Sequence, residues 1–103
     1  TFNQLEICSH YPKYSWSMKT YNIIWQGYLW MGIDRLKMNQ IFSIQQCYEY
    51  MQKLARLKKI RFSSCYEQEE VCKCEIEVFL RRILEETNCL ARLPDGKWKK
   101  IKN

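Results

Sequence analysis

The stretch from Leu36 to Lys59 has the sequence LKMNQIFSIQQCYEYMQKLARLKK, and its pattern of apolar residues decides the predicted fold. Apolar side chains recur here at steps of three and four residues, the spacing that gathers them on one face of an α-helix. The residues that form this stripe are Ile41, Ile44, Tyr48, Met51, Ala55 and Lys58, and Cys47 and Leu54 widen it. Lys and Arg fill the last turns, where cations complement the negative end of the helix dipole. We therefore predict a helix over residues 36–59.

A second helix is predicted a few residues further on. Ser64 and Glu67 have the spacing of a capping box, and Glu69 and Glu70 follow in the first turns. Its apolar face consists of Cys72, Ile76, Phe79, Leu80, Ile83 and Leu84. Two helices joined by a short turn lie antiparallel. The sequence thus predicts a helical hairpin over residues 36–89, which Asn88 would end.

The flanking segments are less regular. Residues 1–9 have the spacing of a short amphipathic helix, which Pro12 would end. Residues 11–32 contain seven aromatic side chains, which we interpret as core filling, although a surface that contacts a membrane or a partner is the alternative. After Leu93, a Pro94-Asp95-Gly96 turn leads into basic residues. We expect one helical domain over residues 1–93 and a basic C-terminal tail over residues 94–103.

Length and composition restrict the function classes. The chain has 103 residues, 47% of them hydrophobic, which suits a single folded domain and excludes a disordered tail. No apolar run approaches the ~18–20 residues of a membrane span, so we predict that the chain is not transmembrane. Three glycines and two prolines are too few for the many tight turns of an all-β sandwich. The formal net charge of +6 favours an anionic partner.

The six cysteines indicate a disulfide framework, because a domain this small buries a limited core. They are Cys8, Cys47, Cys65, Cys72, Cys74 and Cys89, and sequence alone does not choose among their possible pairings. A zinc site at Cys72-Lys73-Cys74 is the alternative, but one intervening residue is tight for a tetrahedral metal. We therefore expect a mainly α, small disulfide-rich domain with two long antiparallel helices and a short N-terminal helix. The cysteine count also predicts secretion, and we expect no metal or cofactor.

Residues for catalysis are few. His10 is the only histidine, and no serine has a G-x-S-x-G setting. Neither type of glycine-rich phosphate loop is present. The acidic residues near Glu69 and Glu70 are explained by their place at a helix start. The sequence predicts no catalytic site.

Positive charge is concentrated in two blocks, residues 53–61 and 97–102. Polybasic segments attract anionic lipids and acidic proteins, and aromatic side chains favour the membrane interface. The predicted binding residues are Lys53, Arg56, Lys58, Lys59, Arg61, Trp25, Trp30, Lys97, Trp98, Lys99 and Lys100. The expected partner is an anionic phospholipid surface or an extracellular protein receptor, with nucleic acid less favoured.

Several short spacings resemble the secreted phospholipase A2 family. Phe2 precedes Cys8 by six positions, and Gly27 lies about where a calcium-loop glycine would. Two further islands carry the resemblance: Cys47-Tyr48 followed by Lys53-Leu54, and Val71-Cys72-Lys73-Cys74-Glu75, which is similar to an apolar residue followed by C-x-C-D. The resemblance implies two disulfide-linked antiparallel helices and a Cys47–Cys74 bridge.

The differences from that family determine which function the resemblance implies. Its catalytic histidine and calcium-binding aspartate fall on Ile44 and Gln45, and its supporting aspartate falls on Glu75. An isoleucine cannot accept a proton from an attacking water, and an uncharged glutamine contributes little to a calcium site. The resemblance therefore implies a secreted, non-catalytic binding protein.

Two other functions are considered. Residues 75–82, with the sequence EIEVFLRR, resemble the last helix of short-chain four-helix cytokines, which would make the chain a helical extracellular ligand. A hydrolase with an unfamiliar arrangement of residues is the third hypothesis.

Overall fold

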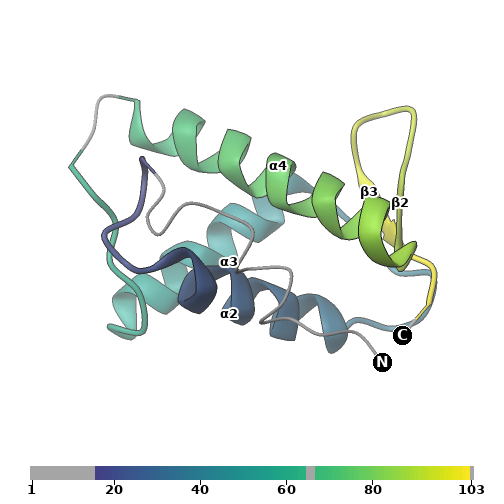
Figure 1. The fold of residues 1–103 in the computed structure, drawn as a ribbon, viewed down its shortest axis with the longest axis horizontal. Coiled ribbons are helices and arrows are strands. Elements are labelled where there is room, and N and C mark those ends of the chain that lie inside the picture. The colour runs from purple at the N-terminus through teal and green to yellow at the C-terminus, as the bar shows by residue number, and fades with distance from the viewer. Residues whose placement is uncertain (1–15, 65–66, 103) are drawn as a thin grey trace.

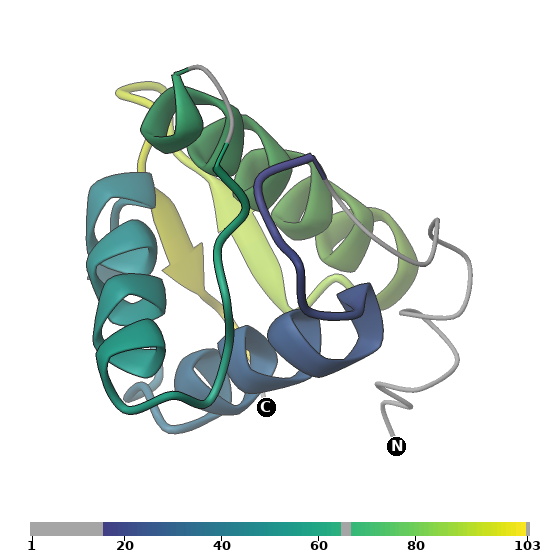
Figure 2. The same ribbon diagram turned by 90° about the vertical axis from the view of Figure 1, so that its left-hand side faces the viewer.

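The computed structural model describes residues 16–64 and 67–102. Its helices are α2 (Asn22–Asp34), α3 (Ile44–Arg56) and α4 (Gln68–Thr87), and its strands are β1 (Ile41–Phe42), β2 (Leu90–Arg92) and β3 (Trp98–Lys100). In Figure 1, α4 lies across α2 and α3, and the β2–β3 hairpin stands at one end of the molecule. Viewed down the long axis in Figure 2, the three helices surround the interior, with strands behind them.

A small sheet corrects the predicted fold class. The three strands pair antiparallel in the order β1-β3-β2, so β3 is the central strand. Trp98 of β3 lies opposite both Phe42 and Arg92 and is completely buried. The prediction of a mainly α domain was wrong because residues 98–100, which we expected in a basic tail, form the centre of this sheet.

The two predicted helices exist, but the first begins later than expected. Ser43 caps α3, because its side chain accepts a hydrogen bond from the Gln46 N–H while the Gln46 side chain accepts one from the Ser43 N–H. Upstream, Asn39 has a left-handed backbone with φ of 65°, which separates α2 from strand β1. Asn88 ends α4 in the left-handed conformation, as predicted. Glu67, by contrast, begins α4 without a side-chain cap, so the expected capping box is not formed there.

The core lies between α4 and the elements around it. Side chains less than 2% exposed include Trp25, Leu29, Met51, Ile76, Phe79, Leu80, Ile83, Leu90 and Trp98. The edge of one ring faces the other in the Trp25–Phe79 pair, with centroids 6.0 Å apart. Trp30 is also buried, so core filling is the role of both predicted tryptophans of the aromatic segment.

The predicted disulfide framework is corrected as well. Cys47, Cys74 and Cys89 form no disulfide, which excludes the implied Cys47–Cys74 bridge. Cys47 is buried on α3, whereas Cys74 is exposed on α4. Helical geometry explains why Cys74 is exposed. Cys72 and Ile76 face the core, and Cys74, midway between them on the helix, faces solvent. Cys8, Cys65 and the expected N-terminal helix over 1–9 lie outside the described residues.

No helix in the described ranges 16–64 and 67–102 combines the length and the apolar content needed to cross a bilayer.

Candidate functional site

The two predicted basic blocks lie at opposite ends of the molecule. Residues 53–61 belong to the last turns of α3 and the loop that follows, whereas residues 97–100 belong to the β2–β3 hairpin (Figure 1). The thirteen residues of α3 separate them, because α3 begins beside the sheet and ends at the far side. The blocks therefore do not form the single surface that their composition suggests.

The hairpin uses part of its basic block for folding. Lys100 is only 3% exposed, and its Nζ donates hydrogen bonds to the carbonyl oxygens of Asp34 at 2.7 Å and Leu36 at 3.0 Å. An ammonium at the end of α2 satisfies carbonyls that lack helical partners and complements the helix dipole. With Trp98 also buried, two of the four predicted binding residues of this block belong to the interior. Lys97 is exposed and Lys99 is partly buried.

Glu77 of α4 neutralises positive charge at the hairpin. One of its carboxylate oxygens lies 2.6 Å from Arg92 Nη1 and 3.5 Å from Arg81 Nη2. Its other oxygen accepts a hydrogen bond from Trp98 Nε1 at 3.2 Å. The Arg92 guanidinium also lies over the Trp98 ring, 5.5 Å from its centroid. The Arg92 guanidinium therefore forms an ion pair with Glu77 and also stacks on the Trp98 ring.

The opposite end of the molecule presents cations that no carboxylate of the described residues neutralises. We call this surface the basic end, and its members are Lys19, Lys53, Arg56, Lys58, Lys59 and Arg61, all of them exposed. Within the described part of the chain, none of these six side chains forms an ion pair with a carboxylate. The predicted cations of residues 53–61 are thus brought together on one exposed surface.

Pairing of two short segments adds Lys19 to the basic end. Met18 and Phe62 form an antiparallel bridge, and the Lys19 N–H donates to the Arg61 carbonyl at 2.9 Å. Figure 2 shows the segment around residue 18 beside the loop around residue 62. Lys19 and Arg61 are therefore opposed across the pair, an arrangement of like charges that weakens strand pairing. Sequence reasoning missed Lys19 because it is distant from the block along the chain.

Lys58 occupies a position that normally favours glycine. The Lys58 N–H donates to the Ala55 carbonyl and the Lys59 N–H to the Leu54 carbonyl, which together form a Schellman motif at the end of α3. The motif requires a left-handed residue, and Lys58 has φ of 59°. A side chain with a Cβ is strained in this conformation. Such strain is found at functional sites, and here the strained residue is one of the exposed cations of the basic end.

Two large apolar side chains are exposed at the same end. Trp16 is 81% exposed and Leu57 is 57% exposed. The sequence prediction chose Trp25 and Trp30 instead, because nothing in the aromatic segment distinguishes the exposed ring from the buried ones. A tryptophan in solvent beside cations is the combination that favours a membrane interface.

The backbone of Trp16 is fixed although its ring is in solvent. The Glu75 carboxylate accepts hydrogen bonds from the backbone N–H groups of Trp16 at 2.8 Å and Ser17 at 3.1 Å, and from the Ser17 hydroxyl. On the other side, the Ser63 hydroxyl donates to the Trp16 carbonyl. Glu75 therefore positions Trp16 from α4, and Ser63 positions it from the loop of the basic end.

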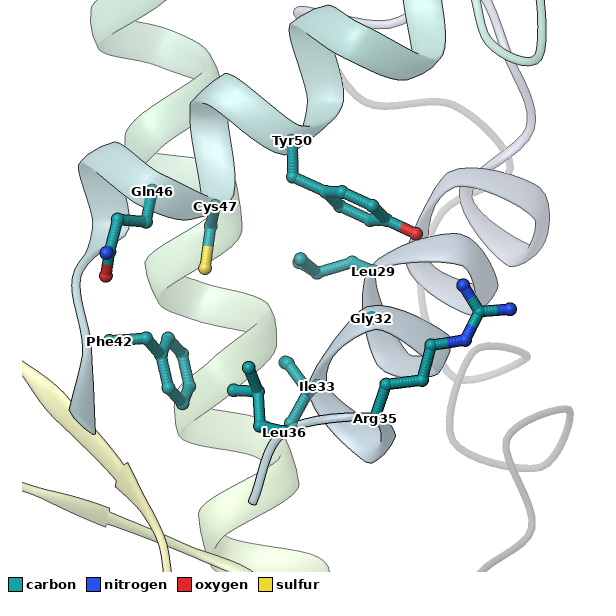
Figure 3. A pocket seen from close by; sticks show the side chains of 9 residues that line it. All are labelled: Leu29, Gly32, Ile33, Arg35, Leu36, Phe42, Gln46, Cys47 and Tyr50. Carbon is teal, nitrogen blue, oxygen red and sulfur yellow. The ribbon is translucent and has the colours of Figure 1, made fainter. Parts of the chain in front are cut away.

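A separate feature is an apolar cleft of about 250 Å³ between α2 and α3 (Figure 3). Its lining consists of Leu29, Gly32, Ile33, Arg35, Leu36, Phe42, Gln46, Cys47 and Tyr50. Burial raises the pKa of the Cys47 thiol to about 12, so it stays protonated at neutral pH and acts as an apolar wall. None of the residues that we predicted to bind a partner lies in this cleft.

The described residues contain no group of three or more His, Cys, Asp or Glu side chains that could hold a metal ion. His10 lies outside them. The described surface presents cations and apolar side chains at the basic end, and an apolar cleft elsewhere.

Comparison of the chain with family models, with curated proteins and with solved structures gives no match.

Proposed function

We propose that this chain is a non-catalytic binding protein that attaches to an anionic phospholipid surface through the basic end, with Trp16 and Leu57 entering the interface. The observation that carries the proposal is a set of six exposed cations without carboxylate partners in the described residues, next to two exposed apolar side chains. A protein receptor is the less favoured partner, because the large exposed ring and the cations together suit a lipid headgroup region.

The magnitudes are sufficient for reversible attachment. Each Lys or Arg near an anionic leaflet contributes about 1 kcal/mol. Burial of Trp16 and Leu57 adds about 0.8 kcal/mol for each apolar CH₂-sized group removed from water. Electrostatic attraction of this kind is screened by salt, with a Debye length of about 8 Å at physiological ionic strength. We therefore expect binding that weakens steeply as salt rises.

Vesicle sedimentation with two charge-reversal variants tests the proposal. The first variant is Lys59→Glu with Arg61→Glu at the basic end, and the matched control is Lys97→Glu with Lys102→Glu at the hairpin end. Both variants have the same net charge, so a difference between them reports where the surface lies. We expect the basic-end variant to lose at least tenfold in affinity for vesicles containing phosphatidylserine, since each replaced cation contributes about 1 kcal/mol and each new carboxylate is repelled.

The control variant should bind within about twofold of the native chain, because the two ends lie far apart relative to a Debye length of about 8 Å. Equal losses in both variants would show that net charge alone is responsible and would overturn the proposed surface. Equal binding of the native chain to neutral and anionic vesicles would overturn the role of the cations, and failure to bind either kind of vesicle would remove the lipid function altogether.

The other predicted functions have less support. The cytokine-like hypothesis needs a four-helix arrangement, whereas the described residues form three helices and a three-stranded sheet. Secretion stays a prediction, and it no longer rests on a disulfide framework among Cys47, Cys74 and Cys89.

A further inference from the structure

We propose that the cleft between α2 and α3 binds a medium-chain carboxylic acid, with the acyl chain in the cleft and the carboxylate at Arg35. The site is distinct from the basic end, and the proposal does not depend on membrane attachment. It rests on the size of the cleft, its apolar walls and the single cation at its rim.

The walls of the cleft are suited to an unbranched apolar chain. Leu29 and Ile33 of α2 form one side, and Phe42 and Cys47 form the opposite side (Figure 3). These four side chains belong to the core, so the walls are held by packing that extends beyond the cleft. The protonated Cys47 thiol adds no charge that would have to be desolvated.

The volume limits the length of the chain. About 250 Å³ lies just below the ~300–1,000 Å³ range of small-molecule sites, so only a small ligand fits. Since a water-sized group takes about 30 Å³, the cleft holds about eight such groups. An eight-carbon acid fits this space, whereas a full membrane acyl chain would extend well beyond it.

Gly32 lets the Tyr50 ring pack closely against α2 at the wall of the cleft. A Cβ at residue 32 would lie 3.0 Å from Cε2 of the Tyr50 ring, which is too close without movement of that ring. The Tyr50 hydroxyl donates to the Tyr28 carbonyl at 3.2 Å, so the ring is tied to α2 and is not free to turn away. The close approach of the Tyr50 ring to α2 at the wall of the cleft therefore depends on glycine at this position.

Arg35 gives the rim its charge. Its side chain is exposed, and within the described residues it forms no ion pair with a carboxylate. Figure 3 shows the guanidinium on the same rim of the cleft as the Tyr50 hydroxyl. A guanidinium binds a carboxylate through two parallel N–H donors, which selects an acid over an alcohol or an amine of the same length.

Calorimetric titration with octanoate, octanol and octylammonium, each below its micelle concentration, tests the proposal. The native chain should bind one octanoate, with octanol at least tenfold weaker, because a charged hydrogen-bonded contact is worth about 1.5–3 kcal/mol or about 10- to 150-fold. Arg35→Glu should lower octanoate affinity at least to that of octanol and should improve octylammonium binding. Lys37→Glu is the matched control, because it reverses a charge two residues away that does not line the cleft, and it should bind as the native chain does.

A filled cleft gives an independent test. Cys47→Leu places extra methyl groups in the space and should weaken octanoate and octanol by at least tenfold, in a protein whose thermal midpoint shows that it is folded. Failure of the native chain to bind octanoate, or octanoate binding that survives both Arg35→Glu and Cys47→Leu, would overturn the site. Arg35→Glu and Cys47→Leu leave the basic end intact, so vesicle sedimentation separates this proposal from the proposed function.

Discussion

The basic end and the β2–β3 hairpin have similar composition but opposite roles. Each combines lysines with a tryptophan nearby, yet Trp16 is 81% exposed at one and Trp98 is 0% exposed at the other. At the hairpin, Glu77 neutralises Arg92, and Lys100 satisfies the end of α2. At the basic end no described carboxylate pairs with the cations. The comparison teaches that the fold, and not the local composition, decides which cations and aromatic rings are buried or paired and which stay exposed.

The largest effect is expected when Trp98→Ala is compared with Trp16→Ala. Removal of the buried Trp98 ring should lower the free energy of unfolding by about 3–5 kcal/mol, through lost burial and the cavity left behind. Trp16→Ala should change it by less than about 0.5 kcal/mol, because the exposed ring packs against little. Urea denaturation followed by circular dichroism measures both. Similar losses in the two variants would contradict the assignment of one ring to the core and the other to solvent.

A smaller effect is expected at Lys100. Lys100→Met keeps the apolar stem but removes the ammonium that binds the carbonyls of Asp34 and Leu36. The free energy of unfolding should fall by about 1–3 kcal/mol, the cost of buried polar groups left without partners. Lys99→Met is the neighbouring control and should stay within about 0.5 kcal/mol of the native chain. If Lys100→Met has native stability, the ammonium is not part of the interior.

The smallest effect is expected for Lys58→Gly, which should raise stability while it weakens vesicle binding. Relief of the left-handed strain should stabilise the chain by about 1 kcal/mol, while loss of one cation should weaken vesicle binding about fivefold. The control is Lys59→Gly, which removes the same charge at a residue without positive φ and should weaken binding without raising stability. Thermal unfolding and vesicle sedimentation measure the two quantities. Stabilisation with native vesicle affinity would remove Lys58 from the surface.

The helical periodicity of the sequence predicted α3 and α4 because each buries one continuous stripe. That stripe suffices for a helix, since residues three and four apart share a face. It could not predict β1 and β3, which are two and three residues long and gain their stability from each other. Ile41 continues the helical spacing by coincidence, and only the pairing of Ile41 with Lys99 and of Phe42 with Trp98 makes these two residues a strand.

The sequence predicted most of the cations of the candidate site but not its exposed tryptophan, Trp16. Residues 53–61 end a helix and enter a loop, where long cationic side chains extend into water. The sequence does not distinguish Trp16 from Trp25. The backbone of Trp16 is held at the surface by hydrogen bonds with Glu75 and Ser63, and these residues are distant from it along the chain. Arg35 and the cleft were missed for the same reason, since the cleft exists only between packed helices.

The central position of β3 has a consequence for the order of folding during synthesis. Strands β1 and β2 do not pair with each other, and each meets the sheet only through β3. A ribosome must therefore translate past residue 100 and release that segment from its exit tunnel before the sheet can assemble and Trp98 can fill the core. Until then, α2, α3 and α4 can form helices but leave part of their apolar faces in water, so a nascent chain stalled near residue 93 should be a strong substrate for chaperones and proteases.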